Sequence, residues 1–436
     1  MPSNYGSVSP SPAATEDRAY GVAMAAVTTV FFMWGFVTVL NDILVPHLKS
    51  IFELNYAQIM LIQFTFFSAY FLMSMPAAKV IARLGYQGSI VLGLVVMGAG
   101  ALLFDPAASA ASYGLFLLAL WVLASGITLL QVAANPYVAV LGPPKGASSR
   151  LNLAQAFNSL GTALAPYVGG ALILSNVSRP VASLHSLSPD QLQAYRTAEA
   201  STVKLPYVAI ALALFLLAFA ISRFRLPVLA AIESRHDGEP KEPLSALWKH
   251  RHLVLGALGI FLYVGAEVSI GSFLVNYFSQ PDIGALTERA AAGYVSFYWT
   301  GAMIGRFIGS AALHRAHPGK ALGTVAIVAS LLVCTSILTS GHVAMWTIIL
   351  VGLFNSIMFP NIFTLGISGL GKLTGQGSGI LVMAIVGGAI IPIAQGALAD
   401  RIGIHMAFIL PALCYLYVAY YGFVGQAISN QRSAIS

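Results

Sequence analysis

The sequence predicts an all-α membrane protein, with twelve transmembrane helices arranged in two six-helix bundles. Its composition is the first observation: 58% of the 436 residues are hydrophobic, 8% are charged, and the mean hydropathy is +0.80. Soluble domains carry about a quarter charged residues. Segments of about 20 apolar residues, long enough to cross about 30 Å of hydrocarbon, recur along the chain. The third observation is an internal repeat that relates the two halves.

Twelve apolar segments are the predicted helices. Twelve crossings are an even number, so both ends of the chain are expected on the same side of the bilayer. The segments lie near residues 22–46, 57–81, 88–104, 113–138, 151–174, 205–224, 252–278, 292–312, 321–338, 343–366, 376–398 and 404–426.

The longest charged run, at 223–251, divides the chain, because six apolar segments precede it and six follow it. A second polar stretch, 176–204, is expected to be an outer loop. The Ser/Pro-rich N-terminus has no basic region before the first apolar segment, so we do not expect a cleavable signal peptide. The predicted units are a tail at 1–21, a bundle at 22–224, a linker at 225–251, a bundle at 252–426 and a tail at 427–436.

Basic residues indicate the orientation. With the N-terminus inside, fifteen Lys and Arg fall on the inner side and six on the outer side. Cytoplasmic loops carry the excess of Lys and Arg, so both termini and the linker are expected in the cytoplasm. The net charge of +7 follows from this bias and indicates no nucleic-acid partner.

The two halves share a pattern of Pro and Gly. Asn135-Pro136 in the fourth segment matches Phe359-Pro360 in the tenth, at an offset of 224. In the fifth and eleventh segments the offset is 226, for Gly161 with Gly387, Pro166 with Pro392 and Gly170 with Gly396. Parallel six-helix repeats joined by a cytoplasmic linker are typical of major facilitator transporters, which bind substrate near the midplane between the halves.

Several motifs carry a closer resemblance. They are LLQVAANPYVAVLGP and ASSRLNLAQAFNSLGTALAP in the region 130–172, WGFVTVLNDILVPHLK in the first segment, YFLMSMPAAKVIARLGY from the second segment toward the third, and NSIMFPNIFTLGI in the tenth. Over about residues 28–424 the sequence resembles the fucose/galactose/glucose:proton symporters of the major facilitator superfamily. The resemblance implies a major facilitator fold, a bacterial inner-membrane location and uptake of a sugar with protons.

The same resemblance implies roles for single residues. Asp42 matches the aspartate regarded as the family's protonation site, and Gln155 and Asn158 match polar residues of the sugar site. Gln131 is a departure, because the fucose transporter carries a glutamate in an otherwise similar context. A neutral amide at this position argues against fucose itself as the substrate.

Amide side chains suit a sugar because they donate and accept hydrogen bonds at once. Gln155 and Asn158 are three apart and share a helix face, with Asn152 one step further toward the cytoplasm. The alternative is that they join packed helices, as Asn and Gln commonly do in membranes. Asn135, Asn276 and Asn355 complete the predicted set of amides for the sugar site.

Two carboxylates lie within apolar segments, Asp42 and Glu267. A charge at that depth is costly, so each is a candidate for proton coupling. The alternative for Asp42 is a solvated helix-end acid or a partner for Lys49. For Glu267 it is a structural hydrogen bond, and a third possibility is that it supplies the acidic role that Gln131 lacks.

Aromatic and basic residues complete the predicted site. Tyr263, on the Glu267 helix, and Trp299 are candidates to pack on the apolar face of a pyranose. Arg306 lies within the eighth segment, toward its inner end, and is predicted to act with Arg83 and Arg315 in the cytoplasmic gate. Asp400-Arg401 imitates a cytoplasmic Asp-Arg turn but is expected on the outer side.

The sequence therefore predicts proton-coupled symport of a hexose or deoxyhexose of the glucose, galactose or fucose type, by alternating access, in a protein that works as a monomer. Uptake of N-acetylglucosamine or another amino sugar, and uncoupled facilitation, are alternatives. A membrane-embedded enzyme or lipid-handling protein is the alternative from another class. The segments contain no Ser/His pair, paired acids or metal-ligand spacing, so we expect no catalytic residue, metal or cofactor.

Overall fold

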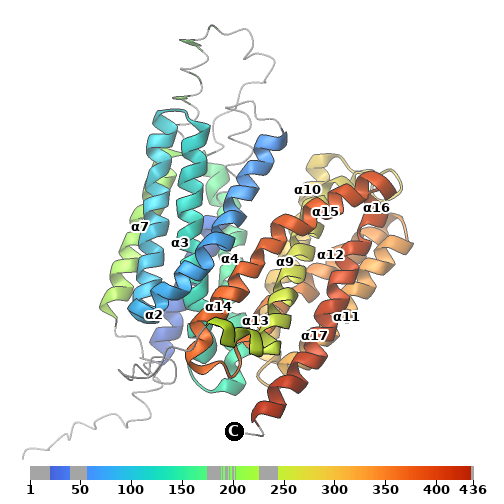
Figure 1. Ribbon diagram of the computed structural model, residues 1–436. Helices are drawn as coiled ribbons and strands as arrows, with labels where there is room; N and C mark the ends of the chain where they lie inside the picture. The colour runs from blue at the N-terminus through green and yellow to red at the C-terminus, as the bar shows by residue number, and fades with distance from the viewer. Residues whose placement is uncertain are drawn as a thin grey trace, which may run out of the picture.

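The structure is a computed structural model that describes residues 20–39, 56–173, 188, 190–191, 195, 197–198, 201, 203–224 and 244–433. Asp42 and Lys49 lie outside these residues. The described regular elements are all α-helices and short 3-10 turns. They form two bundles, one on each side of the molecule in Figure 1.

The N-terminal bundle contains one helix that holds two predicted spans. This helix, α2 (Tyr56–Ser109), changes direction at Gly85, which has φ 70° and ψ −179°. An L-residue with a Cβ is strained in that region, so glycine permits the turn between the two spans. The other helices of this bundle are Tyr20–Val39, α3 (Tyr113–Val140), α4 (Ala147–Ile173) and α7 (Lys204–Arg223).

The C-terminal bundle begins with three uninterrupted helices and ends with three interrupted spans. The uninterrupted helices are α9 (Arg251–Phe278), α10 (Glu288–Ala312) and α11 (Pro318–Leu338). The tenth predicted span is divided into α12 (Gly341–Asn355) and α13 (Met358–Ile367), the eleventh into α14 (Thr374–Met383) and α15 (Gly387–Ile402), and the twelfth into α16 (Ile404–Ala407) and α17 (Ile409–Ser433).

Proline explains the break in the tenth span. Pro360 has no N–H, so the carbonyl of Ser356, four residues earlier, loses its intrahelical donor. The helix is interrupted at Ser356 and Ile357. Pro136 stands at the equivalent place in α3, where the helix continues and the carbonyl of Val132 is the one left without an intrahelical donor.

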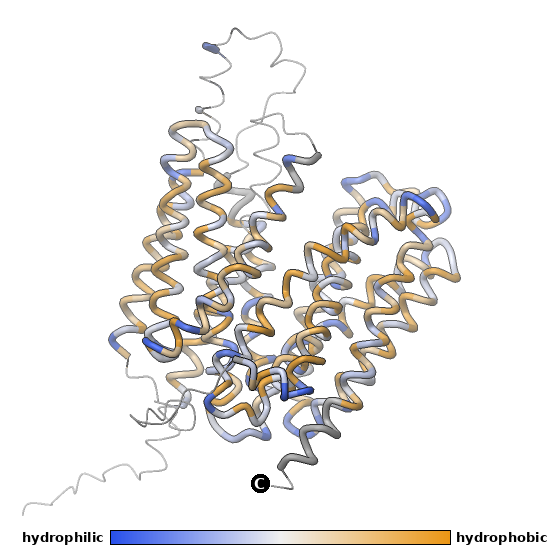
Figure 2. Tube along the Cα trace, in the orientation of Figure 1, coloured by the Kyte–Doolittle hydropathy of each residue, from blue (hydrophilic) through white to orange (hydrophobic). Residues whose placement is uncertain are grey.

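Hydropathy agrees with a membrane location, because apolar residues extend along the helices and hydrophilic residues gather mainly at their ends (Figure 2). Nine helical stretches of the described chain are long and apolar enough to cross a membrane. One of them, Leu61–Ser109, contains two predicted spans. The two remaining spans are α4 and α10, which carry more polar residues. The twelve-helix layout is thus confirmed.

The bundles meet along two seams. Helix α4 packs against α10 and α13, and α14 packs against α2 and α3, with α15 also against α2. Glycine makes the second seam close: a Cβ added at Gly379 would lie 3.1 Å from both Cβ of Ala78 and the carbonyl oxygen of Ser74, and one at Gly388 would lie 2.8 Å from the Phe67 ring. The candidate site lies between these seams.

Candidate substrate site

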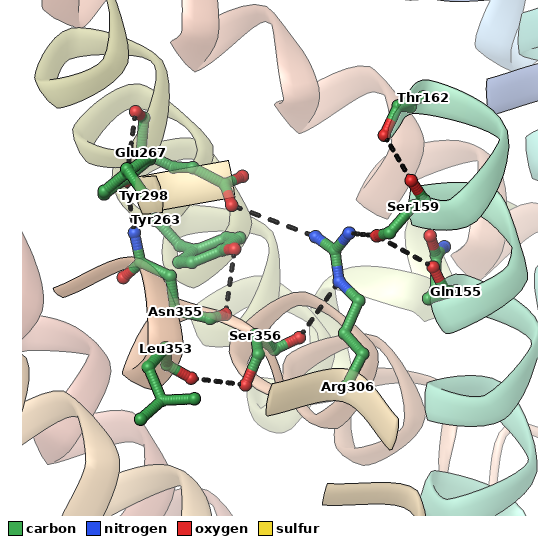
Figure 3. A network of polar contacts seen from close by, with 10 residues as sticks. All are labelled: Gln155, Ser159, Thr162, Tyr263, Glu267, Tyr298, Arg306, Leu353, Asn355 and Ser356. Atoms are coloured by element: carbon green, nitrogen blue, oxygen red, sulfur yellow. Dashed lines mark hydrogen bonds and ion pairs between the residues drawn. The ribbon is translucent and has the colours of Figure 1, made fainter. Parts of the chain in front are cut away.

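Three helices of the C-terminal bundle bring a group of polar side chains together (Figure 3). The Asn355 side-chain amide donates to the Tyr298 hydroxyl over 2.7 Å, and the Tyr263 hydroxyl donates to the backbone carbonyl of Asn355 over 3.0 Å. The Tyr298 hydroxyl also reaches the backbone carbonyl of Glu267 at 3.5 Å. Tyr263, Tyr298 and Asn355 are fully buried, so α9, α10 and α12 are fixed to one another around Glu267.

Arg306 connects this group to the other bundle. Its guanidinium lies 3.9 Å from the Glu267 carboxylate, and its Nε donates to the carbonyl of Ser356 over 3.3 Å. Its Nη1 donates to the hydroxyl of Ser159 on α4. Only 15% of the Arg306 side chain and 13% of the Glu267 side chain are exposed. A buried charge requires such compensation, and the carbonyl that Pro360 deprives of a donor supplies part of it.

A row of polar side chains lies in the N-terminal bundle, on α2, α3 and α4. The Gln131 amide donates to the Tyr70 hydroxyl over 2.7 Å, and the Gln155 amide donates to Oδ1 of Asn135 over 3.4 Å. Ser159, one turn further along α4, donates to the backbone carbonyl of Gln155 over 3.1 Å. The structure therefore brings Gln131, Asn135 and Gln155 to one region of the N-terminal bundle, and Ser159, on the same helix as Gln155, accepts a hydrogen bond from Arg306.

Asn158 and Asn152 make contacts of a different kind. The Asn158 amide donates to the backbone carbonyl of Phe31 over 2.9 Å, which ties α4 to the first helix. The Asn152 amide donates to the Ser148 carbonyl over 2.8 Å and to Oδ1 of Asn361, in the other bundle, over 3.3 Å. Both contacts fit the alternative in which amides join packed helices.

Four predicted site residues lie apart from this network. Asn276 is exposed near the end of α9. Trp299 is 45% exposed, and its ring lies 5.0 Å from that of Tyr298 between centroids. Arg83, two residues before the turn of α2 at Gly85, and Arg315, just after the end of α10, are both exposed.

Several buried polar atoms have no hydrogen-bond partner among the described residues. They include Nδ2 of Asn135 in the N-terminal bundle. In the C-terminal bundle the Tyr415 hydroxyl lies within hydrogen-bonding reach of the Asn355 side chain. Buried polar groups are nearly always paired with protein or water. Amide and hydroxyl groups on both sides of Arg306 can therefore exchange hydrogen bonds with a ligand rich in hydroxyl groups.

Sequence reasoning missed Tyr70, Ser159, Tyr298 and Ser356. One signal could have found Ser356, because it stands four residues before a proline that the repeat had already singled out. Among the described residues no three His, Cys, Asp or Glu are grouped in a way that could hold a metal ion. The arrangement offers hydrogen bonds and one ion pair to a ligand.

Two bundles of membrane-crossing helices that meet around a buried polar network define a multi-pass membrane transporter. The model of the Major Facilitator Superfamily matches residues 22–385. A glucose/galactose transporter of Brucella abortus is 52% identical over 94% of this chain and 96% of its own length. The chain therefore belongs to the Major Facilitator Superfamily and, within it, to the family of the glucose/galactose and fucose transporters.

A further sequence relative and a solved structure agree with this assignment. The L-fucose-proton symporter of Escherichia coli is 37% identical over 93% of both chains. A crystal structure of the transporter FucP in the outward conformation superposes with a TM-score of 0.87 at 36% identity, covering 93% of this chain and 99% of that one. The predicted family and major facilitator fold are confirmed.

Proposed function

We propose that this protein carries a hexose or deoxyhexose of the glucose, galactose or fucose type into the cell together with protons, by alternating access. The observation that carries this proposal is the network of amides and hydroxyls on both sides of Arg306. Such groups match the mixed donor and acceptor character of sugar hydroxyls. The relatives are named as sugar transporters, and two are named as proton symporters, which favours this class over an enzyme or a lipid-handling protein.

The contacts between the bundles indicate which side is closed. Ser148 and Thr364 share a hydrogen bond of 2.7 Å, Ser149 donates to the Ser310 carbonyl over 2.7 Å, and Ser310 returns a bond of 3.0 Å to the Ser149 carbonyl. These residues lie at the beginning of α4 and toward the ends of α10 and α13. The excess of Lys and Arg supports a cytoplasmic location for this end. These contacts support a state that is closed toward the cytoplasm and binds sugar from outside.

Proton coupling is assigned to Asp42 and Glu267. A proton on Asp42 removes a charge within the bilayer and favours the outward-open site for sugar. A proton on Glu267 removes the counter-ion of Arg306 and leaves a buried guanidinium with neutral partners only, which is costly. The state in which Ser159 and Arg306 separate is then favoured. A ligand shifts such an equilibrium by binding the two states differently.

The proposal also covers the location of the protein, its oligomeric state and its partners. Both termini and the linker at 225–251 lie in the cytoplasm, the membrane is the bacterial inner membrane, and the monomer is the functional unit. The partners are the sugar, protons and the surrounding lipid, with no nucleic acid and no cofactor. An amino sugar such as N-acetylglucosamine would use the same amides.

The test is uptake of labelled galactose by proteoliposomes with an imposed proton gradient. We expect accumulation that collapses when a protonophore is added, and competition by unlabelled glucose or fucose. Accumulation that survives the protonophore would exclude proton coupling. Saturable equilibration without accumulation at any gradient would identify a facilitator. Competition by N-acetylglucosamine alone would assign the site to amino sugars.

A further inference from the structure

Tyr70 is a buried residue of α2 that sequence reasoning did not select. Only 3% of it is exposed, and its hydroxyl lies 2.7 Å from Nε2 of Gln131. Its ring packs on those of Phe66 and Phe67, at 5.4 and 6.3 Å between centroids. Phe67 in turn abuts Gly388 of the other bundle. Tyr70 thus stands between the amide of Gln131 and the seam where α2 meets α15.

Hydrogen-bond chemistry gives this contact a direction. By donating one N–H to Tyr70, the Gln131 amide is held in one orientation, with its carbonyl oxygen as the remaining acceptor. The Tyr70 oxygen accepts that bond, and its own proton has no acceptor among the described residues. The pair therefore offers one acceptor and one donor, which is the combination that a sugar hydroxyl needs.

The pair continues the row formed by Asn135 and Gln155. Gln131 and Asn135 are four residues apart on one helix, so they share a face and lie about 6 Å apart along its axis. Asn135 is fully buried, and its Nδ2 has no partner among the described residues. The Tyr70–Gln131 and Asn135–Gln155 pairs therefore both have donors or acceptors that are not used within the described residues.

We propose that Tyr70 is a positioning and specificity-determining residue of the sugar site. It fixes the amide of Gln131 and adds its own hydroxyl as a donor to a sugar hydroxyl. This inference rests on the proposed function, because it assumes that Gln131 faces the sugar.

The test compares Tyr70→Phe, Gln131→Ala and the double variant in purified protein, by equilibrium binding of galactose, glucose and fucose. Loss of one hydrogen bond weakens binding by about 2- to 12-fold, and we expect a loss of this size for galactose in Tyr70→Phe. The ratio of galactose to glucose affinity should change as well, which a purely structural residue would not cause. Because Tyr70 acts partly through Gln131 and partly through its own hydroxyl, the double variant should bind more weakly than Gln131→Ala, but by less than the product of the two single losses.

Tyr113→Phe is the matched control. Tyr113 begins α3, and its hydroxyl donates to the carbonyl of Gln58 on α2 over 2.6 Å, so the same atom is lost from the same helix pair. It should leave the sugar ratio unchanged. Unchanged affinities in folded Tyr70→Phe, or losses that multiply in the double variant, would overturn the role of Tyr70. If the Gln131→Ala and Gln155→Ala variants both bind sugar with wild-type affinity, the proposed location of the sugar site is wrong.

Discussion

Ser378 donates a hydrogen bond of 2.8 Å to the backbone carbonyl of Val132, in the opposite bundle. That carbonyl stands four residues before Pro136 and has no donor within its own helix. In the second repeat, the carbonyl of Ser356 stands four residues before Pro360 and accepts from Arg306 over 3.3 Å. The repeated proline therefore creates an acceptor in each half, and the one in α3 is used to join the halves.

Replacing Ser378 by Ala should loosen the closed end. The Val132 carbonyl would remain buried without a donor, at a cost of about 1–3 kcal/mol, so the population open to the cytoplasm should rise. Spin labels at positions 145 and 315, in a background without the native cysteines, would report a longer distance between the bundles. Ser330→Ala is the matched control, because Ser330 donates to the Ala412 carbonyl over 3.1 Å within one bundle. Equal distances in both variants would count against the role of Ser378.

Glu267→Gln should lower the stability of the protein and abolish coupled uptake. Removing one partner of a buried ion pair costs about 3–5 kcal/mol, whereas replacing both partners costs far less. The double variant Glu267→Gln/Arg306→Met should therefore melt closer to the wild type than Glu267→Gln does, while transport remains lost. Thermal unfolding of purified protein measures the difference. A wild-type melting temperature for Glu267→Gln would show that Arg306 does not depend on this acid.

Asp42→Asn should abolish uphill accumulation and preserve exchange. The amide resembles the protonated acid, so sugar binding and the movement of the halves are expected to continue without the gradient. Uptake against a gradient measures accumulation, and the exchange of labelled for unlabelled galactose across proteoliposome membranes without a gradient measures exchange. Full accumulation by this variant would remove Asp42 from the coupling mechanism.

Gln155→Ala should affect sugar binding alone, whereas Asn158→Ala should also affect stability. Gln155 contacts only the polar row, so its loss should weaken galactose binding by about 1–3 kcal/mol with little change in melting temperature. Asn158 holds the first helix through the Phe31 carbonyl, so its loss should lower the melting temperature as well. Parallel binding and unfolding measurements separate the two effects. Equal melting temperatures would indicate that the Asn158 contact is dispensable.

Much of the fold could be predicted because apolar length and the Pro and Gly repeat both survive in the sequence. The turn at Gly85 and the break before Pro360 follow local backbone chemistry. The helix face that meets the other bundle could not be predicted, since lipid-facing and core-facing positions are both apolar. Asn276 and Trp299 were selected by residue type; the structure leaves Asn276 exposed and places the half-exposed Trp299 ring against that of Tyr298. Tyr70, Ser159 and Ser378 depend on contacts between distant helices that spacing does not reveal.

The closed end is joined by uncharged groups, namely the hydroxyls of Ser148, Ser149, Ser310 and Thr364 and the amides of Asn152 and Asn361. Dissolved ions screen the attraction between exposed opposite charges, with a screening length of about 10 Å at 0.1 M salt, but they do not weaken hydrogen bonds between neutral groups in this way. A gate of this chemistry should therefore keep its strength as the ionic strength rises, whereas a gate made of surface ion pairs would weaken.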